Sequence, residues 1–281
     1  MQKSSDKALA QLIFAMFIYG TVGVVRRFVV FPSAFIAGVR GIVGALFLMC
    51  FNRKYDREAV KKDLVLLITA GVLVGCNWIL FFESQRYTSI AVSTMCYYTA
   101  PIMVILVSPL ILKEKLTANK IIATILAALG IVLLSGKAEG ASAKGVTLGL
   151  LAAVGYATQL FVNKFVKHTD GLDRTIIPIM TAGIVSLPYS LCTETIPMPD
   201  LKSLLLLALI CFVHTGIAYA LYFSSIKHLE AQTVALASFV DPATAVLCST
   251  LILSEQMSLY SGIGCLLIFV AIVLASTQKR R

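Results

Sequence analysis

The sequence YYTAPIMVILVSPLILKE, residues 97–114, returns 141 positions later as SFVDPATAVLCSTLILSE, residues 238–255. The alignment needs no gap. The fifth residue of each stretch is a proline, Pro101 and Pro242, and the last residue of each is a glutamate. Aliphatic residues match one another by chance, but proline and glutamate are costly inside an apolar segment. Their recurrence indicates a duplicated unit in which this stretch is the pivot of each half.

The composition places this duplicated chain in a membrane. Hydrophobic residues make up 58% of the sequence and charged residues 14%, whereas soluble domains carry about 25% charged residues. A helix of about 20 apolar residues spans the hydrocarbon core of a bilayer, and stretches of that length follow one another along the chain. We therefore predict an all-α polytopic membrane protein in contact with the lipid bilayer.

Ten apolar segments with short connections account for the sequence. The first is too long for the apolar region of a signal peptide, and no small-residue cleavage site follows it, so we expect it to remain as a span. The predicted spans are 8–29, 33–51, 63–84, 88–112, 117–135, 145–167, 174–192, 201–223, 231–253 and 257–276.

Basic residues predict the orientation. With the N-terminus inside, 17 of the 24 Lys and Arg residues fall on the inner side, as the positive-inside rule requires. The prediction is a protein of the cell (inner or cytoplasmic) membrane with both termini in the cytoplasm. This bias and the anionic lipid of the inner leaflet account for the net charge of +10, and no nucleic-acid partner is indicated.

The repeat and the span count together predict an inverted repeat. Five spans per half is an odd number, so the second half, residues 137–281, enters the membrane upside down relative to residues 1–136. The first spans of the halves also correspond, since Tyr19 aligns with Tyr156 at a shift of 137 positions. Two inverted five-helix repeats within one integral membrane domain are typical of secondary transporters.

Ionised side chains inside apolar spans cost about 2.5–3.5 kcal/mol each on insertion scales, so each needs a partner or a function. Arg40 lies in the second span and Asp241 in the ninth. Either the two pair with each other, or Arg40 receives a substrate carboxylate and Asp241 accepts a proton or a cationic group. Pro242 favours a kink beside a cavity at this point. Glu83 completes the charged set, although it lies three residues from Arg86 and is expected to pair with it.

Polar and aromatic side chains within the spans are the other candidates. Most Tyr and Trp residues of membrane proteins collect at the interfaces, but seven here lie deep in spans: Tyr19, Trp78, Tyr97, Tyr98, Tyr156, Tyr219 and Tyr222. A hydrated cavity would give their polar groups partners and suits organic solutes through cation–π contact of about 0.5–2 kcal/mol. The alternative is that several of them only pack. The predicted substrate-binding residues are Tyr19, Asn77, Trp78, Tyr97, Tyr98, Tyr156, Gln159, His214 and Tyr219.

Small residues are spaced for close contact between helices. Gly38, Gly41 and Gly44 recur on the second span, and Gly145 and Gly149 open the sixth. They predict packing and carry no chemistry.

Other functional classes lack their signatures. The seven cysteines show no metal-ligand spacing, so we predict no metal site and no cofactor. Asp241 has no second aspartate beside it within the spans, and no hydrolase or nucleotide-binding motif is present, so no catalytic residue is predicted and the chain is not expected to be an enzyme. A receptor or scaffold would be expected to carry a soluble domain or long tails. Any driving force for transport would come from a gradient.

The sequence resembles the EamA-type branch of the drug/metabolite transporter superfamily. The resemblance rests on the paired segments 101–114 and 242–255, on NWILFFESQRYTSIAVS at 77–93 and on VRGIVGALFL at 39–48. It implies ten helices in an inverted repeat, with a central cavity lined mainly by the first, third, fourth, sixth, eighth and ninth spans. Ser254 departs from the family's pattern where the first half has a lysine.

The resemblance implies alternating-access transport of a small organic metabolite. Many relatives export amino acids and similar metabolites, and we predict export of amino acids or related compounds. The alternative is proton-coupled uptake of choline or another quaternary amine, with Asp241 as the counter-charge. The oligomeric state stays open.

Overall fold

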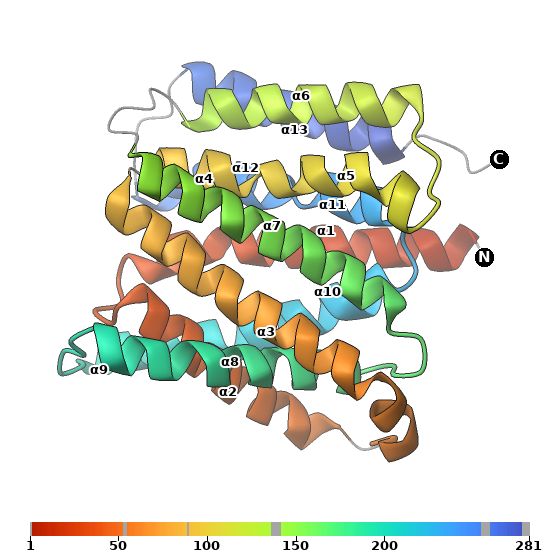
Figure 1. The fold of residues 1–281 in the computed structure, drawn as a ribbon. Helices are drawn as coiled ribbons and strands as arrows, with labels where there is room; N and C mark the ends of the chain where they lie inside the picture. The colour runs from red at the N-terminus through yellow and green to blue at the C-terminus, as the bar shows by residue number, and fades with distance from the viewer. Residues whose placement is uncertain (1, 53–54, 89, 136–141, 254–258, 277–281) are drawn as a thin grey trace.

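The computed structural model describes residues 2–52, 55–88, 90–135, 142–253 and 259–276, and these residues form helices without any strand (Figure 1). The elements are α1 (Gln2–Arg26), α2 (Ser33–Phe51), α3 (Arg57–Tyr87), α4 (Ile90–Tyr97), α5 (Thr99–Ile111), α6 (Ala118–Ser135), α7 (Ala143–Phe165), α8 (Asp173–Thr193), α9 (Leu201–Leu209), the π-helix η1 (Ile210–Ile217), α10 (Ala218–Ile226), α11 (Ala231–Ala237), α12 (Val240–Leu253) and α13 (Leu259–Ser276).

Eight helical segments are long and apolar enough to cross a membrane by length and composition. They are Asp6–Arg26, Ser33–Phe51, Arg57–Tyr87, Val92–Ile111, Ala143–Phe165, Asp173–Thr193, Leu201–Ile226 and Ala231–Ile252. Two shorter apolar helices, Ala118–Leu133 and Gly262–Ala271, occupy the positions predicted for the fifth and tenth spans. The chain is therefore a multi-pass, all-helical membrane protein.

Helices of the first half pack on helices of the second half. α2 lies against α8, α6 against α13, α3 against α7, and α1 against α12 and α10. In Figure 1 the pair formed by α6 and α13 borders one side of the bundle, and α2 and α8 lie together on the other. These pairings interleave the two halves within one bundle.

Glycines allow the closest of these helix contacts. A Cβ atom added to Gly41 on α2 would lie 2.7 Å from the Cα of Gly183 on α8, and one added to Gly71 on α3 would lie 2.5 Å from the Pro178 carbonyl oxygen. Real side chains never approach backbone atoms so closely, so only glycine fits. The small residues of the second span therefore do what the sequence predicted, since they bring two helices into backbone contact.

Both copies of the pivot stretch are interrupted helices. The first breaks between α4 and α5 at Tyr98, and the second breaks between α11 and α12 at Ser238 and Phe239. Pro101 and Pro242 each lie in the first turn of the second segment, where a missing backbone N–H costs nothing. The break in the ninth span therefore precedes the proline instead of centring on it.

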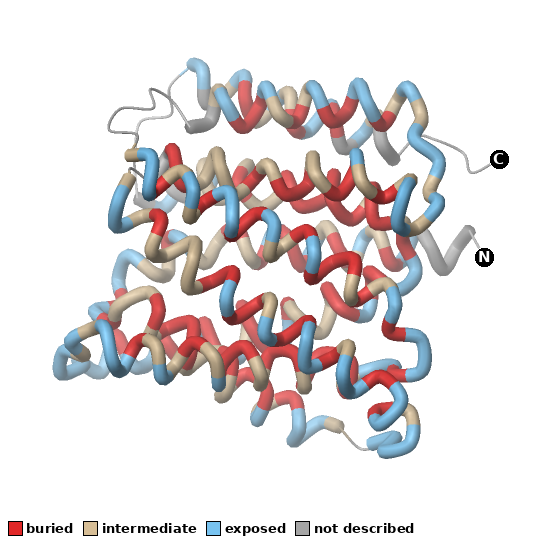
Figure 2. Tube along the Cα trace, viewed as in Figure 1, coloured by how far each residue is buried: buried red, intermediate tan, exposed pale blue. Residues whose placement is uncertain are grey.

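Burial follows the pattern of a membrane protein. Buried residues lie toward the middle of the bundle and exposed ones toward its outside (Figure 2). Many of the exposed residues are large and apolar. Leu110 is 83% exposed and Leu251, its equivalent in the repeat, is 80% exposed. Apolar side chains this exposed on all outer helices suit contact with lipid.

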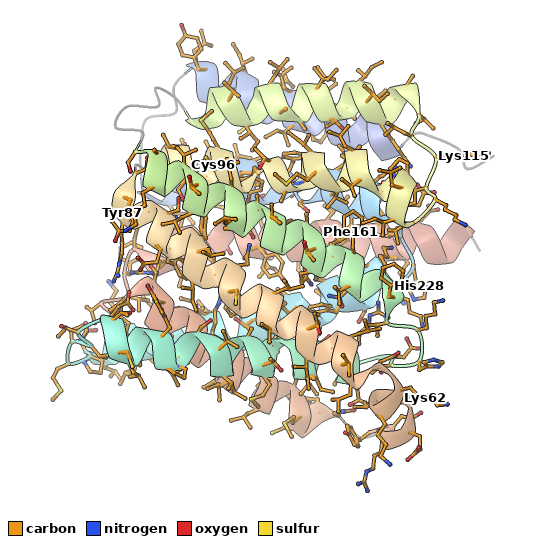
Figure 3. All side chains as sticks on the ribbon, in the orientation of Figure 1. Lys62, Tyr87, Cys96, Lys115, Phe161 and His228 are labelled. Atoms are coloured by element: carbon orange, nitrogen blue, oxygen red, sulfur yellow. The ribbon has the colours of Figure 1, made fainter. Side chains whose placement is uncertain are left out.

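The two ends of the bundle are distinguished by the course of the chain. α1 begins and α13 ends at the same end, which we call the terminal end (Figure 1). Lys62, Lys115 and His228 lie at this end, whereas Tyr87 lies at the opposite one, called the far end (Figure 3).

Candidate functional site

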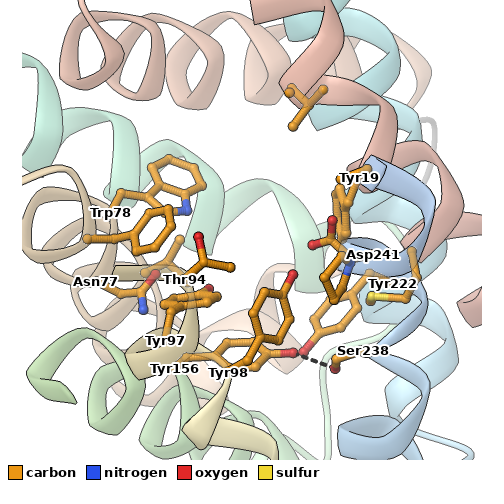
Figure 4. Close-up of a pocket in the computed structure, with 18 of the residues that line it drawn as sticks. Tyr19, Asn77, Trp78, Thr94, Tyr97, Tyr98, Tyr156, Tyr222, Ser238 and Asp241 are labelled. Atoms are coloured by element: carbon orange, nitrogen blue, oxygen red, sulfur yellow. Dashed lines mark hydrogen bonds between the residues drawn. The ribbon is translucent and has the colours of Figure 1, made fainter. Parts of the chain in front are cut away.

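A cavity of about 600 Å³ lies among α1, α2, α3, α4, α7, α10 and α12. Its volume suits a small organic molecule. Ten of the predicted site residues line it: Tyr19, Arg40, Asn77, Trp78, Tyr97, Tyr98, Tyr156, Gln159, Tyr219 and Asp241. The structure thus brings together side chains from both halves of the chain around one space (Figure 4).

Two predicted residues lie outside the cavity lining. The Glu83 carboxylate forms an ion pair of 2.8 Å with Arg86, three residues further along α3. His214 is buried on η1, and its Nε2 lies 2.9 Å from the Thr21 hydroxyl of α1. Glu83 has the helical partner that its spacing predicted, and His214 joins two helices behind the cavity wall.

Sequence reasoning missed several lining residues. Phe81 and Phe82 are common residue types in apolar helices, and Gly20, Thr94 and Ser238 are small, so none of them carries a signal of its own. Tyr222, which belongs to the predicted aromatic set, lines the cavity as well.

The cavity occupies the half of the bundle nearer the far end. On α1 its lining begins at Met16, and on α3 it begins at Val74, so the first half of each helix contributes nothing. Both helices start at the terminal end. On these two helices the cavity is therefore lined only from the half nearer the far end.

Polar contacts between the halves hold the terminal end together. The Asp63 carboxylate on α3 accepts hydrogen bonds of 2.7 Å from the backbone N–H groups of both His168 and Thr169, which follow α7. The Thr169 hydroxyl in turn donates to the Ala59 carbonyl of α3. Hydrogen bonds to a carboxylate are stronger than those between neutral groups. They therefore attach the loop after α7 firmly to α3.

Glu114, the last residue of the first pivot stretch, makes a second polar contact between the halves at this end. Its carboxylate accepts hydrogen bonds from the backbone N–H groups of Ala231 at 2.7 Å and Gln232 at 3.2 Å, at the start of α11. Lys120 forms an ion pair of 2.5 Å with Glu230 beside it. Glu114 therefore satisfies two free donors of a helix in the other half of the chain.

The Arg40 guanidinium faces the cavity without a protein acceptor. Its Cζ lies 4.1 Å from the centroid of the Trp78 ring, which is a cation–π contact. Its Nε is buried and has no hydrogen-bond partner, and Arg40 forms no ion pair within 4.0 Å, in the part of the chain that the structure describes. The predicted pairing of Arg40 with Asp241 is therefore not formed as a direct salt bridge.

Asp241 presents its carboxylate to the cavity on the side opposite Trp78 (Figure 4). It lies in the first turn of α12, where the helix dipole favours a negative charge. The Tyr98 phenol is beside it, and Arg40 is close enough to interact electrostatically but not to pair.

An aromatic network connects these walls. Tyr97 and Tyr156 are stacked, with ring centroids 5.7 Å apart, and Tyr219 contacts both Tyr19 and Trp78 edge-on at 5.1 and 6.1 Å. The Tyr156 hydroxyl also shares a hydrogen bond of 2.9 Å with Ser238, at the helix break before α12. The walls are thus held in fixed positions around the space between them.

Asn77 has a structural contact as well as a cavity position. Its side-chain amide donates a hydrogen bond of 2.6 Å to the Ala152 carbonyl of α7. In the described residues, no three His, Cys, Asp or Glu side chains gather in the way that a metal ion requires.

Comparisons with known proteins give the family. The chain is 25% identical over 99% of its length to a protein of Bacillus subtilis named "Uncharacterized transporter YxxF", of which it covers 92%. It is 26% identical over 74% of its length to "Protein PecM" of Dickeya dadantii, of which it covers 72%. A solved crystal structure shares the fold with a TM-score of 0.86, covering 98% of this chain and 99% of that chain at 16% identity.

The model of the EamA-like transporter family matches the sequence twice, at residues 6–136 and at 143–277. These matches take in nearly the whole chain and confirm the resemblance predicted from the paired segments. The chain belongs to the EamA-like transporter family.

Proposed function

We propose that this transporter is a secondary active exporter of amino acids that works by alternating access. The observation that carries the proposal is a cavity between interleaved halves, lined by two interrupted helices and by an arginine that forms no ion pair with any described residue. In transporters, helices interrupted at corresponding positions of two halves are the best indicator of a substrate site.

The arrangement of helix pairs supports an inverted repeat. α2 packs on α8 and α6 packs on α13, and in each pair the second helix is the repeat equivalent of the first. The contact of α3 with α7 likewise has its counterpart in the contact of α10 with α1. This exchange of equivalent partners is what a two-fold axis between the halves would produce. Rocking of one half against the other would then move the opening from one end to the other.

An amino acid fits the free charge on Arg40. A guanidinium offers several donors in a planar fork that matches a carboxylate. Stacking on Trp78 orients the fork and leaves its edge available. The aromatic walls would then contact the rest of the substrate.

Uptake of a quaternary amine coupled to protons is the second candidate. It is favoured by Asp241, whose carboxylate lies among the phenols of Tyr98, Tyr156 and Tyr222 on the cavity wall. Aromatic faces and a carboxylate together form the usual environment for a quaternary ammonium group.

Counterflow in proteoliposomes tests the two functions. Vesicles that contain the whole protein are preloaded with amino acids or with choline, and entry of the labelled compound is compared with entry into empty vesicles. Accelerated entry of amino acids supports the first function, and accelerated entry of choline alone supports the second. In either case Asp241→Asn tests proton coupling, because pH dependence that survives unchanged in this variant would exclude Asp241 as the proton site.

The membrane orientation is part of the proposal. With 17 of 24 basic residues on the side of the termini, the terminal end would face the cytoplasm and the cavity would face outward. Reporter fusions at each end of the chain test this orientation, since a reporter that is active only in the cytoplasm should work at both termini.

A further inference from the structure

We propose that the cavity recognises both charged groups of a free α-amino acid, with the carboxylate on Arg40 and the ammonium on Asp241. The inference rests on the proposed function and narrows it, because a substrate would need both a carboxylate and an ammonium group to bind well. Amines without a carboxylate and carboxylic acids without an amine would then be poor substrates.

Arg40 would bind the carboxylate. Its guanidinium lies 4.1 Å from the Trp78 ring centroid, and its buried Nε has no partner among the described residues. An arginine that stacks through its face keeps its N–H groups directed outward from its edge, where a carboxylate can accept two of them. The Tyr19 hydroxyl is a second polar atom of a lining residue that has no hydrogen-bond partner in the described part of the chain.

Asp241 would bind the ammonium group. The start of α12 supports a negative charge there, and no lysine or arginine forms an ion pair with this carboxylate in the described part of the chain. The neighbouring Tyr156 hydroxyl is already engaged with Ser238. A ligand ammonium group would therefore supply the missing counter-charge.

Figure 4 shows Trp78 and Asp241 on opposite sides of the open space. The Arg40 guanidinium stacks on the Trp78 ring. The charges of Arg40 and Asp241 are opposite and sum to zero. A ligand with no net charge keeps the net charge of the occupied cavity at zero. A zwitterion pairs with both Arg40 and Asp241 at once, whereas an amine leaves Arg40 unpaired and an acid leaves Asp241 unpaired. An unpaired buried charge is costly, so each incomplete ligand should bind more weakly.

The test is competition in proteoliposomes with the wild-type chain. The twenty standard amino acids, each in labelled form, are screened for counterflow. The one that exchanges fastest serves as the labelled substrate in the competition experiment. Its decarboxylated amine and its deaminated carboxylic acid, each with the same side chain, then serve as competitors. We expect each analogue to compete at least about tenfold less well than the unlabelled amino acid, since a site built for a polar group rejects a ligand that lacks it.

Variants assign each charge to its wall. In Arg40→Gln the decarboxylated amine should compete as well as the amino acid does. In Asp241→Asn the deaminated carboxylic acid should compete as well as the amino acid does. Glu58→Gln is the matched control, because Glu58 is an exposed residue at the start of α3 that pairs with Lys61, and its selectivity should equal that of the wild type.

The outcomes separate the two proposals. Equal competition by the amino acid and either analogue on the wild-type protein would overturn the two-charge site and leave amino acid transport intact. Exchange of choline without exchange of any amino acid would overturn both. Because selectivity is measured on the wild-type chain, a variant that fails to fold does not affect this decision.

Discussion

At the scale of single residues, the hydrogen bond between Tyr156 and Ser238 links the stacked tyrosines to the helix break before α12. Tyr156→Phe keeps the ring stack on Tyr97 and removes only the 2.9 Å bond. We expect it to lower the unfolding free energy by about 1 kcal/mol and to slow exchange. Thermal unfolding in detergent and counterflow measure the two effects.

A double-mutant cycle shows whether that bond is responsible. Ser238→Ala removes this bond and also the 3.0 Å bond from the Ser238 hydroxyl to the Val234 carbonyl, so it should cost more than Tyr156→Phe. The double variant should cost little more than Ser238→Ala alone, since the bond to Tyr156 is already lost in that variant. Tyr260→Phe is the control, because Tyr260 is 66% exposed on α13. Additive losses in the double variant would show that the two side chains act separately.

Which residues line the cavity could be predicted only in part from the sequence. Arg40 and Asp241 attract attention because a charge inside an apolar segment is costly, and Trp78 does so because it lies away from the interface. Phe81 and Gly20 give no such signal. Which face of a helix points inward depends on how its neighbours pack, and this also explains why the buried His214 contacts Thr21 instead of the cavity.

At the scale of helices, the crossing of α2 with α8 depends on the absence of side chains. Gly41→Ala would place a methyl group 2.7 Å from the backbone of Gly183, so the helices must separate. We expect a loss of about 1–3 kcal/mol of stability, which is the usual cost of overpacking. Gly262→Ala on α13 is the control, since nothing lies within 4 Å of its added carbon. Equal unfolding temperatures for the two variants would contradict this account.

The helical elements were predicted more completely than their interruptions. Apolar length alone locates α1, α2 and α3 in the sequence. The breaks at Tyr98 and at Ser238 were not predictable, because a proline near a helix start is compatible with a kink, a break or an intact first turn. The π-helical segment η1 has no sequence signature either, since its formation depends on how neighbouring helices pack against it.

At the scale of the whole molecule, the polar contacts at the terminal end and the cavity lined from the far-end halves of α1 and α3 would correspond to one of the two states of the proposed alternating access. Opening the terminal end would break polar contacts between the halves, including those of Asp63 with the loop after α7 and of Glu114 with the start of α11. Water can take the place of the lost partners when the end opens. The stability of the closed state should therefore depend on them.

Glu114→Ala tests this dependence. The substitution removes the acceptor for the N–H groups of Ala231 and Gln232, and losing a helix cap costs about 0.5–2 kcal/mol. We expect hydrogen–deuterium exchange at the start of α11 to accelerate several-fold, together with that of the loop after α7, because both polar contacts lie at the same end. Glu58→Ala removes an exposed carboxylate of α3 and should change neither segment. Acceleration confined to α11 would show that the two contacts open independently, and unchanged exchange would show that Glu114 does not hold this end closed.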